Sequence, residues 1–282
     1  MTTSELEQAI EQLVAPGCVP LPAEARTTVD ALLDALEAGT VRAAERAADG
    51  RWNAVPWVKR GILVGFKVGV LADMSPTETG PFSFVDKDTY PTRKFRVEDG
   101  VRIVPGGSTI RRGTHVKPGV VCMPPMFINV GAWVGTGTMI DSHALVGSCA
   151  QIGERVHISA GVQIGGVLEP VNAAPVIIED DVIVGGNCGI YEGTVVRERA
   201  VIGAGVILTR STPVYDLVCK KVYRASAGTA LEIPTGAVVV PGARAINQPW
   251  TRDQGVSVQT PIIVKYRDDK TDAATALEEW LR

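Results

Sequence analysis

Apolar residues return at every sixth position through the middle of the chain. The first run of this register comprises Ile110, Val116, Cys122, Ile128, Val134, Ile140, Val146, Ile152, Ile158 and Ile164. The second run comprises Ile178, Val184, Ile190, Val196, Ile202, Leu208 and Val214. An α-helix repeats about every 3.6 residues and a strand about every 2, so neither explains the spacing. A six-residue period is typical of a β-helix, in which each hexad forms one short parallel strand and a turn.

The neighbours of the register positions fit the interior and the turns of such a coil. The residue two positions earlier is often small, as at Ala132, Thr138, Ala144, Ala150 and Ala200. Glycine often follows the register residue, as at Gly135, Gly147, Gly153, Gly165, Gly185 and Gly203. We expect a sharp turn there, where a Cβ atom would be costly. With three hexads per coil, the register predicts between about five and six coils, each rising by about 4.8 Å.

The segments before the register have ordinary periodicities. SELEQAIEQLVA and AEARTTVDALLDALEAG have the apolar spacing of helices, and Gly39 is the expected C-cap of the second. VRAAERA and RWNAV flank an Asp-Gly pair, which predicts a hairpin, and WVKRGILVGF predicts another helix. We therefore expect a small α/β cap domain at residues 1–100 and the β-helix at 101–214.

The rest of the chain is expected to form an excursion loop and a C-terminal extension. Residues 165–177 interrupt the register, and a loop held on a rigid coil is often functional, although a tolerated surface insertion would have the same pattern. In the extension, residues 215–282, strand-like segments include VYDLVCKKVYR, GAVVVPG and VSVQTPIIVKYR. These would cover the open end and the edge of the coil. The last segment, TDAATALEEWLR, predicts a short amphipathic helix.

Composition narrows the class of partner. The formal net charge of −3 and pI of about 5.7 make a nucleic-acid or membrane partner improbable and favour a small molecule or a protein. The five cysteines are scattered and contain no CxxC pair, which argues against a disulfide framework and a zinc ribbon. With no signal-peptide pattern at the start and no long apolar run, we expect a reduced, cytoplasmic protein.

One long stretch resembles a known enzyme family. NVGAWVGTGTMIDSHALVGSCAQIGERVHISAGVQIGGVLEP, followed by PVIIEDDVIVGG, closely resembles the tetrahydrodipicolinate N-succinyltransferases of lysine and diaminopimelate biosynthesis. The resemblance implies a left-handed β-helix, a homotrimer, and sites between subunits for an amino-dicarboxylate and for succinyl-CoA, with no permanently bound cofactor. The cyclic substrate would be opened by water, and its amine would attack the thioester directly. A carboxylate or imidazole must take the amine proton, and a backbone N–H should stabilise the oxyanion.

The resemblance also implies roles for individual residues. Asp141 matches the family's catalytic aspartate. The expected substrate contacts are Arg102, Asp141, His143, Ser148, Gly166 and Glu169. Coenzyme A would contact Gly185, Gly203 and Ala204, and its 3′-phosphate would contact Lys220 and Lys221, with Arg224 nearby. Each has an ordinary alternative, since Asp141 also suits a turn and the arginine and lysines also suit an exposed surface.

The chain departs from the family pattern at three places. NCGIYEG has Gly189 where the family places a glutamate that partners the aspartate, and Glu192 would have to reach from another point on the coil. His143 stands where tryptophan is more usual, and LEIPTG has Glu232 and Ile233 where an arginine is often found. We therefore expect either a changed amine or acyl donor, such as acetyl-CoA in natural-product synthesis, or a mechanism that uses Asp141 with a histidine.

The same fold admits two further classes of function. A zinc-dependent carbonic anhydrase on the same fold needs converging histidines, whereas His115, His143 and His157 are widely spaced in the register, and we expect no metal site. A catalytically silent homologue has only Gly189 in its favour. Cys122 and Cys188 occupy interior positions, so we expect packing roles and no cysteine nucleophile.

Overall fold

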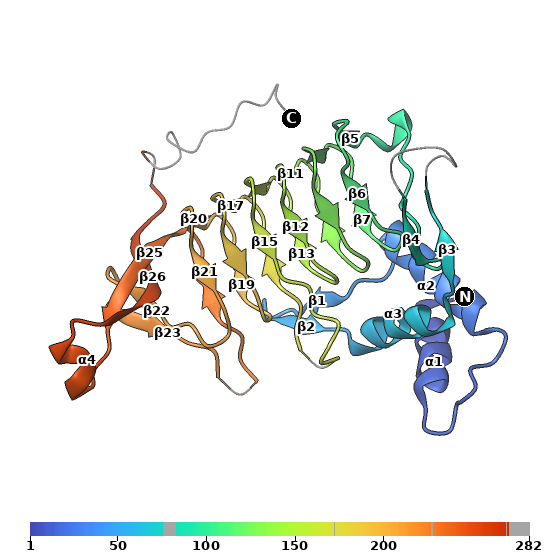
Figure 1. The fold of residues 1–282 in the computed structure, drawn as a ribbon, viewed down its shortest axis with the longest axis horizontal. Helices are drawn as coiled ribbons and strands as arrows, with labels where there is room; N and C mark the ends of the chain where they lie inside the picture. Colours follow the sequence, from blue (N-terminus) through green and yellow to red (C-terminus); the bar gives the residue numbers. More distant parts are fainter. Residues whose placement is uncertain (76–82, 172, 227, 269, 271–282) are drawn as a thin grey trace.

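The hexad register forms a three-sided coil. The computed structural model describes residues 1–75, 83–171, 173–226, 228–268 and 270. Its centre is a left-handed parallel β-helix, with three helices at one end and a hairpin sheet at the other (Figure 1). The predicted fold class is therefore confirmed. None of the helices in the described ranges is long and apolar enough to cross a membrane.

Each side of the coil is a parallel sheet of two-residue strands, and we call the sides face 1, face 2 and face 3. Face 1 contains β7 (His115–Val116), β10 (Trp133–Val134), β13 (Gln151–Ile152), β16 (Ile177–Ile178), β19 (Val195–Val196) and β24 (Glu232–Ile233). Face 2 contains β5 (Arg102–Ile103), β8 (Val121–Cys122), β11 (Met139–Ile140), β14 (His157–Ile158), β17 (Ile183–Val184) and β20 (Val201–Ile202). Face 3 contains β6 (Thr109–Ile110), β9 (Phe127–Ile128), β12 (Leu145–Val146), β15 (Gln163–Ile164), β18 (Gly189–Ile190) and β21 (Ile207–Leu208).

The faces meet at three edges, which we name by the face that precedes each turn. Edge A follows face 1 and includes Glu154 and Arg155, edge B follows face 2 and includes Asp141 and His143, and edge C follows face 3 and includes Ser148. Because strands stack in register, residues 18 positions apart on uninterrupted coils lie on the same edge, as the pairing of Val134 with Ile152 shows.

The predicted interior is confirmed. Every register residue from Ile110 to Leu208 is at most 7% exposed. The small residues that precede them are buried as well: Ala132, Thr138, Ala144, Ala150 and Ala200. One aliphatic and one small side chain per strand fill a narrow prism, and this packing excludes water from the coil.

The glycines after the register residues are required for a different reason from the one expected. A Cβ on Gly135 would lie 2.4 Å from the carbonyl oxygen of Gly153, on the next coil. These glycines therefore allow close stacking of neighbouring coils. The left-handed turn conformation occurs later in each turn, for example at Gly137, His143 and Cys149, with φ of 69°, 62° and 66°.

Two features of the register were not visible in the spacing. Ile178 follows Ile164 directly, from face 3 to face 1, so the excursion loop enlarges a single turn at edge C. Val214 is buried but is not the next coil position, because it begins β22 (Val214–Asp216), which pairs with β23 (Lys221–Tyr223) and β26 (Ser257–Tyr266). The coil resumes at β24, where Ile233 pairs with Val196.

The N-terminal segments form the predicted helices and hairpin. The helices are α1 (Thr3–Val14), α2 (Ala25–Ala38) and α3 (Pro56–Val68). Gly39 caps α2 with φ of 76° and donates to Leu36 O. The hairpin of β1 (Ala44–Arg46) and β2 (Trp52–Ala54) lies against face 1, where Ala44 packs with Ile177 and Val195. A second hairpin, β3 (Leu71–Asp73) with β4 (Val85–Lys87), and the short η1 (Val97–Asp99) lead to β5.

The C-terminal strands extend face 2. β25 (Ala237–Ala245) pairs with β20 and then with β26 (Ser257–Tyr266), which also pairs with β22, and β22 pairs with β23 (Lys221–Tyr223). The short helix α4 (Pro249–Asp253) joins β25 to β26. These strands cover the hydrogen-bonding edge of β20, as expected. The helix predicted for TDAATALEEWLR, residues 271–282, lies outside the described residues.

Candidate active site

Edge B brings the candidate catalytic carboxylate next to a histidine. Asp141 directly follows β11, and His157 points outward from β14 on the next coil of face 2. Asp141 Oδ2 lies 3.5 Å from His157 Nε2, and the side chains are 27% and 16% exposed. The pair is therefore partly desolvated but open to a reactant. Such a pair can accept and hold one proton from an amine.

The remaining predicted residues of edge B lie in the same turn as Asp141 or at the equivalent position of later coils. His143 is exposed in the turn that follows Asp141, and its backbone N–H donates to Pro125 O at 2.5 Å. Gly185 and Gly203 follow β17 and β20, so they occupy the Asp141 position two and three coils further on. A Cβ on Gly185 would lie 2.6 Å from Ala204 N. This part of the edge is therefore a backbone surface without side chains at these positions.

Arg102 lies on the same face but further from the pair. It is exposed on β5, three strands before β14 in the order of the sheet. At about 4.8 Å per strand, its backbone is about 14 Å from that of His157. An extended arginine could contact one end of a substrate whose other end reaches Asp141.

Edge C carries the other predicted substrate residues. Gly166 stacks on Ser148, since a Cβ on Gly166 would lie 2.4 Å from Ser148 N, and Ser148 O accepts from Val167 N at 3.3 Å. Gly166 and Glu169 line a cavity of about 830 Å³ together with Tyr191 and Arg210. The excursion loop forms one wall of this cavity.

The excursion loop is fixed to α3 by a buried lysine. Lys59 is 0% exposed, and its Nζ donates to Ala173 O in the loop. Burial lowers the pKa of Lys59 below its usual value. A lysine is costly in this environment, and its hydrogen bond to Ala173 O links the position of the loop to the N-terminal helices.

Gly189 lies beneath an aromatic ring. A Cβ on Gly189 would lie 2.5 Å from Tyr191 Cε2 and 2.8 Å from the Tyr191 hydroxyl oxygen. The ring also lies over Gly165, where a Cβ would be 2.8 Å from Tyr191 Cδ1. Tyr191 therefore fills the space in which a longer side chain at position 189 would start.

Glu192, the other acid in this segment, has a different partner. Its Oε2 accepts from the backbone N–H of Arg210 at 2.8 Å on edge C. Tyr191 and Arg210 are not among the candidate residues predicted from the sequence. The alternation of side chains along a strand could have identified Tyr191. Ile190 points into the coil, so Gly189 and Tyr191 on either side of it both face outward.

The basic residues expected for coenzyme A lie at the far end of the molecule. Lys220 and Lys221 are exposed in the β22–β23 hairpin, where Lys221 Nζ stands 4.5 Å from the centre of the Tyr223 ring. β23 is five strands beyond β17 in the sheet order, or about 24 Å. One protomer therefore does not bring them next to Gly185. Glu232, in LEIPTG, forms an ion pair with Arg197 at 2.8 Å, and Ile233 points into the coil.

The histidines do not form a metal site in the described part of the chain. His115 lies on face 1, His157 on face 2, and His143 on edge B. His115 stacks on Trp133 with ring centres 3.9 Å apart, and its Nδ1 lies 2.8 Å from Glu37 O. Among the described residues no group of three His, Cys, Asp or Glu side chains is arranged to hold a metal.

The predicted substrate residues are thus divided between two edges of one prism. Asp141, His143 and the glycines lie on edge B, whereas Ser148, Gly166 and Glu169 lie on edge C. The prism core fills the space between the edges, so the two groups cannot contact one ligand within a protomer.

Two family models and several similar curated proteins all point to one enzyme family. Residues 3–68 match the family model described as tetrahydrodipicolinate N-succinyltransferase N-terminal, and residues 175–210 match hexapeptide repeat of succinyl-transferase. A 2,3,4,5-tetrahydropyridine-2,6-dicarboxylate N-succinyltransferase from Aromatoleum aromaticum is 45% identical, covering 93% of this chain and 91% of that protein. Proteins of the same name from Nitrobacter hamburgensis and Acinetobacter baylyi are 42% and 41% identical, covering 92% and 98% of this chain and 90% and 97% of those proteins.

Proposed function

Since this chain belongs to the tetrahydrodipicolinate N-succinyltransferase family, we propose that it transfers the succinyl group of succinyl-CoA to the amine of tetrahydrodipicolinate. It is an acyltransferase of lysine and diaminopimelate biosynthesis. The observation that carries the proposal is the Asp141–His157 pair, 3.5 Å apart on an open edge of a chain with this ancestry. The departures at Gly189 and His143 leave this pair in place.

The proposed chemistry follows from what each group can do. After water has opened the ring, the substrate amine must lose a proton before its nitrogen can attack the thioester carbonyl carbon. Asp141, assisted by His157, accepts that proton. The carbon–nitrogen bond forms, the carbon–sulfur bond breaks, and the thiolate of coenzyme A leaves and is protonated. A backbone N–H of edge B stabilises the oxyanion.

The donor is proposed to lie along edge B. The backbone surface at Gly185, Gly203 and Ala204 allows close approach of an extended chain, because Gly185 and Gly203 have no side chain of their own. Arg102 is proposed to pair with a substrate carboxylate, for which its planar guanidinium is well shaped. Lys220 and Lys221 remain candidates for the phosphates of coenzyme A.

A complete site requires two protomers. The candidate residues on edge B and edge C come together only if edge B of one protomer faces edge C of its neighbour. Such a head-to-tail contact closes into a ring, and we propose a homotrimer. The expected mass in solution is about 90 kDa, three times the chain mass of 29.9 kDa. A monomer in the presence of both substrates would contradict the shared site.

The test is a steady-state assay of the purified protein. We expect turnover with tetrahydrodipicolinate and succinyl-CoA, and much slower turnover with acetyl-CoA. Asp141→Asn should lower kcat by about 10²–10⁴-fold, the usual contribution of a general base. Asp181→Asn, the same substitution on edge A, is the matched control and should retain activity. Preference for another acyl-CoA or amino-dicarboxylate would overturn the proposed substrates, and full activity of Asp141→Asn would overturn the assigned base.

A further inference from the structure

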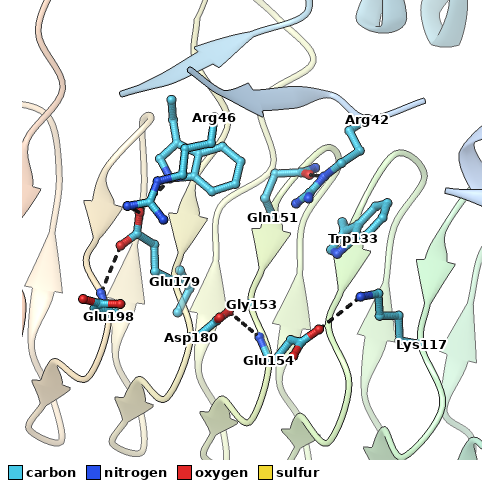
Figure 2. Close-up of a pocket in the computed structure, with 12 residues that line it drawn as sticks. Arg42, Arg46, Lys117, Trp133, Gln151, Gly153, Glu154, Glu179, Asp180 and Glu198 are labelled. Atoms are coloured by element: carbon cyan, nitrogen blue, oxygen red, sulfur yellow. Dashed lines mark hydrogen bonds and ion pairs between the residues drawn. The ribbon is translucent and has the colours of Figure 1, made fainter. Parts of the chain in front are cut away.

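A second pocket lies between the N-terminal hairpin and face 1, away from edges B and C. Its volume is about 290 Å³. Arg42 and Trp52 come from the hairpin side, and Trp133, Gln151 and Asp180 come from the coil (Figure 2). None of these residues belongs to the candidate active site.

Arg42 is held rigidly at the inner end of this pocket. Its guanidinium carbon lies 3.8 Å from the centre of the Trp133 ring, and its Nε donates to Gln151 Oε1 at 3.0 Å. Gln151 is itself 1% exposed and donates to Cys149 O at 2.9 Å. Stacking and this fixed acceptor together set the direction of the guanidinium.

The charge of Arg42 is desolvated and lacks a carboxylate partner. Burial lowers the pKa of Arg42 to about 10, and Glu45 and Asp180 offset this only in part. Within the described residues no carboxylate oxygen lies within 4.0 Å of its guanidinium nitrogens. A partly buried arginine normally has such a partner, and among the described residues only its Nε donates a hydrogen bond, so its two terminal amino groups are available to a ligand.

Two carboxylates that line the pocket, those of Asp180 and Glu198, have no cationic partner among the described residues. Asp180 Oδ1 accepts from Glu154 N at 2.8 Å, and the exposed Glu198 uses its backbone N–H to bind Glu179. Over the described ranges, no cationic nitrogen lies within 4.0 Å of the carboxylate of Asp180 or Glu198. The pocket therefore has one unpaired cation and, separated from it, two unpaired anions.

The other charges of the pocket are compensated internally. Glu179 is 6% exposed and accepts from Trp52 Nε1 at 2.8 Å and from Arg197 Nη1 at 2.9 Å, and Arg46 lies 3.7 Å away. Lys117 pairs with Glu154 at 3.0 Å. These networks form the walls of the pocket, and Figure 2 shows the Lys117–Glu154 pair.

We propose that this pocket is a second ligand site, which binds a small amino acid as its zwitterion. The carboxylate of the ligand pairs with the terminal amino groups of Arg42, and its ammonium group pairs with Asp180 and Glu198. Arg42, Asp180 and Glu198 line the same pocket of about 290 Å³, so a small molecule inside it can contact both charges. A ligand here bridges the N-terminal hairpin and the coil, and so stabilises the folded protein.

The test is calorimetric titration of the full chain with aminocarboxylates of increasing length. The probes are glycine, γ-aminobutyrate and ε-aminocaproate, with caproate and hexylamine as singly charged controls. We expect at least one aminocarboxylate to bind once per chain and to raise Tm. Arg42→Gln and Asp180→Asn should each weaken it about tenfold or more. Arg51→Gln, in the same hairpin but exposed, is the matched control and should bind normally.

Several results would overturn the proposal. These are the absence of binding for every aminocarboxylate, binding that neither Arg42→Gln nor Asp180→Asn weakens, and caproate binding as tightly as ε-aminocaproate. Loss of binding in Asp141→Asn would place the ligand in the active site and would overturn it as well. Should Arg42→Gln fail to fold by circular dichroism, Asp180→Asn decides, because asparagine keeps the oxygen that accepts from Glu154 N. The readout is binding, so it does not depend on which reaction the enzyme catalyses.

Discussion

The Gly189–Tyr191 contact shows how one small residue sets the surface of edge C. Gly189 is buried with the Tyr191 ring lying on it, and this ring also forms part of the cavity wall. The ring and a Cβ at position 189 cannot occupy the same place. The two positions should therefore be energetically coupled.

Gly189→Ala is expected to displace the Tyr191 ring and to destabilise the protein by about 1–3 kcal/mol, the usual cost of overpacking. In a Tyr191→Ala background the same substitution should cost little, because the clash is gone. Urea unfolding of the two single variants and the double variant measures the coupling. Strictly additive changes in the free energy of unfolding would contradict the contact.

Burial decides the chemistry of the cysteines. Desolvation raises the pKa of the Cys122 and Cys149 thiols to about 12, and it also raises the pKa of Cys188, whereas Cys219 is exposed. At pH 8 very few of the Cys122 and Cys149 thiols are ionised, and the thiolate is the reactive form. We expect iodoacetamide to modify Cys219 rapidly in the native protein and to leave the three buried thiols intact.

Mass spectrometry of the labelled protein identifies which cysteines have been modified and so tests this prediction. Labelling in urea should modify all five cysteines and serves as the control. Rapid native modification of Cys149 would show that the interface between α3 and the coil is open. It would also reopen the question of a cysteine nucleophile.

At the scale of elements, the excursion loop depends on α3. Lys59→Met removes the donor to Ala173 O but keeps the volume of the side chain. Since it also removes a buried charge, we expect the free energy of unfolding to change by less than about 1.5 kcal/mol. The loop carries Gly166 and Glu169, so KM for the amine substrate should rise severalfold while kcat changes less. An unchanged KM would show that the loop keeps its position without Lys59, and Lys67→Met, at the exposed end of α3, is the control.

Ion pairs along edge A connect successive coils and should make stability depend on pH. Arg155 Nε and Nη2 donate to Asp181 Oδ1 and Oδ2 at 2.8 and 2.9 Å, and these bonds lower the pKa of Asp181. A carboxyl with a lowered folded pKa stabilises the protein above the unfolded pKa of about 3.9. That contribution is lost as pH falls through the folded value.

Arg155→Met should therefore cost about 0.5–1 kcal/mol at pH 7, a modest figure because both side chains are partly exposed. The difference from the wild type should shrink below about pH 4. Urea unfolding at a series of pH values measures it. A difference as large at pH 2 as at pH 7 would mean that packing of the arginine stem, and not the ion pair, is responsible.

The register made most of the coil predictable, and its failures have a structural cause. Each inward position from Ile110 to Leu208 was correct because one branched side chain per strand is needed to fill the prism. Val214 has the right residue type at the right count, yet the chain leaves the coil after Leu208 and returns at Ile233. Spacing alone does not distinguish a continued coil from a segment that leaves the coil and has an apolar residue at the next register position.

The candidate site was predictable in part for a related reason. The proximity of Asp141 to His157 follows from the stacking of coils, since Asp141 directly follows β11 and His157 lies on β14, the next strand on face 2. The Arg42 pocket left no such signal, because it joins a hairpin to residues more than 70 positions later, such as Trp133 and Gln151. The hairpin has the two-residue period of strands and the coil has a six-residue period. Neither period indicates where the hairpin and the coil contact each other.

At the scale of the whole molecule, the division of the site between edges B and C can be tested by mixing subunits. Asp141→Asn damages edge B and Glu169→Ala damages edge C, so each homotrimer should be inactive. In a mixed trimer, one contact joins an intact edge B to an intact edge C, which restores one site of the three. Random assembly of equal amounts makes about three quarters of the trimers mixed, so activity should return to about a quarter of the wild-type value in the unselected mixture and to about a third after mixed trimers are selected. If each site lay within a single chain, every mixed trimer would stay inactive, because each chain would keep its own damaged residue. Co-expression with two different affinity tags, purification over both and a succinyl-transfer assay distinguishes these outcomes, and homotrimers mixed without exchange provide the inactive baseline.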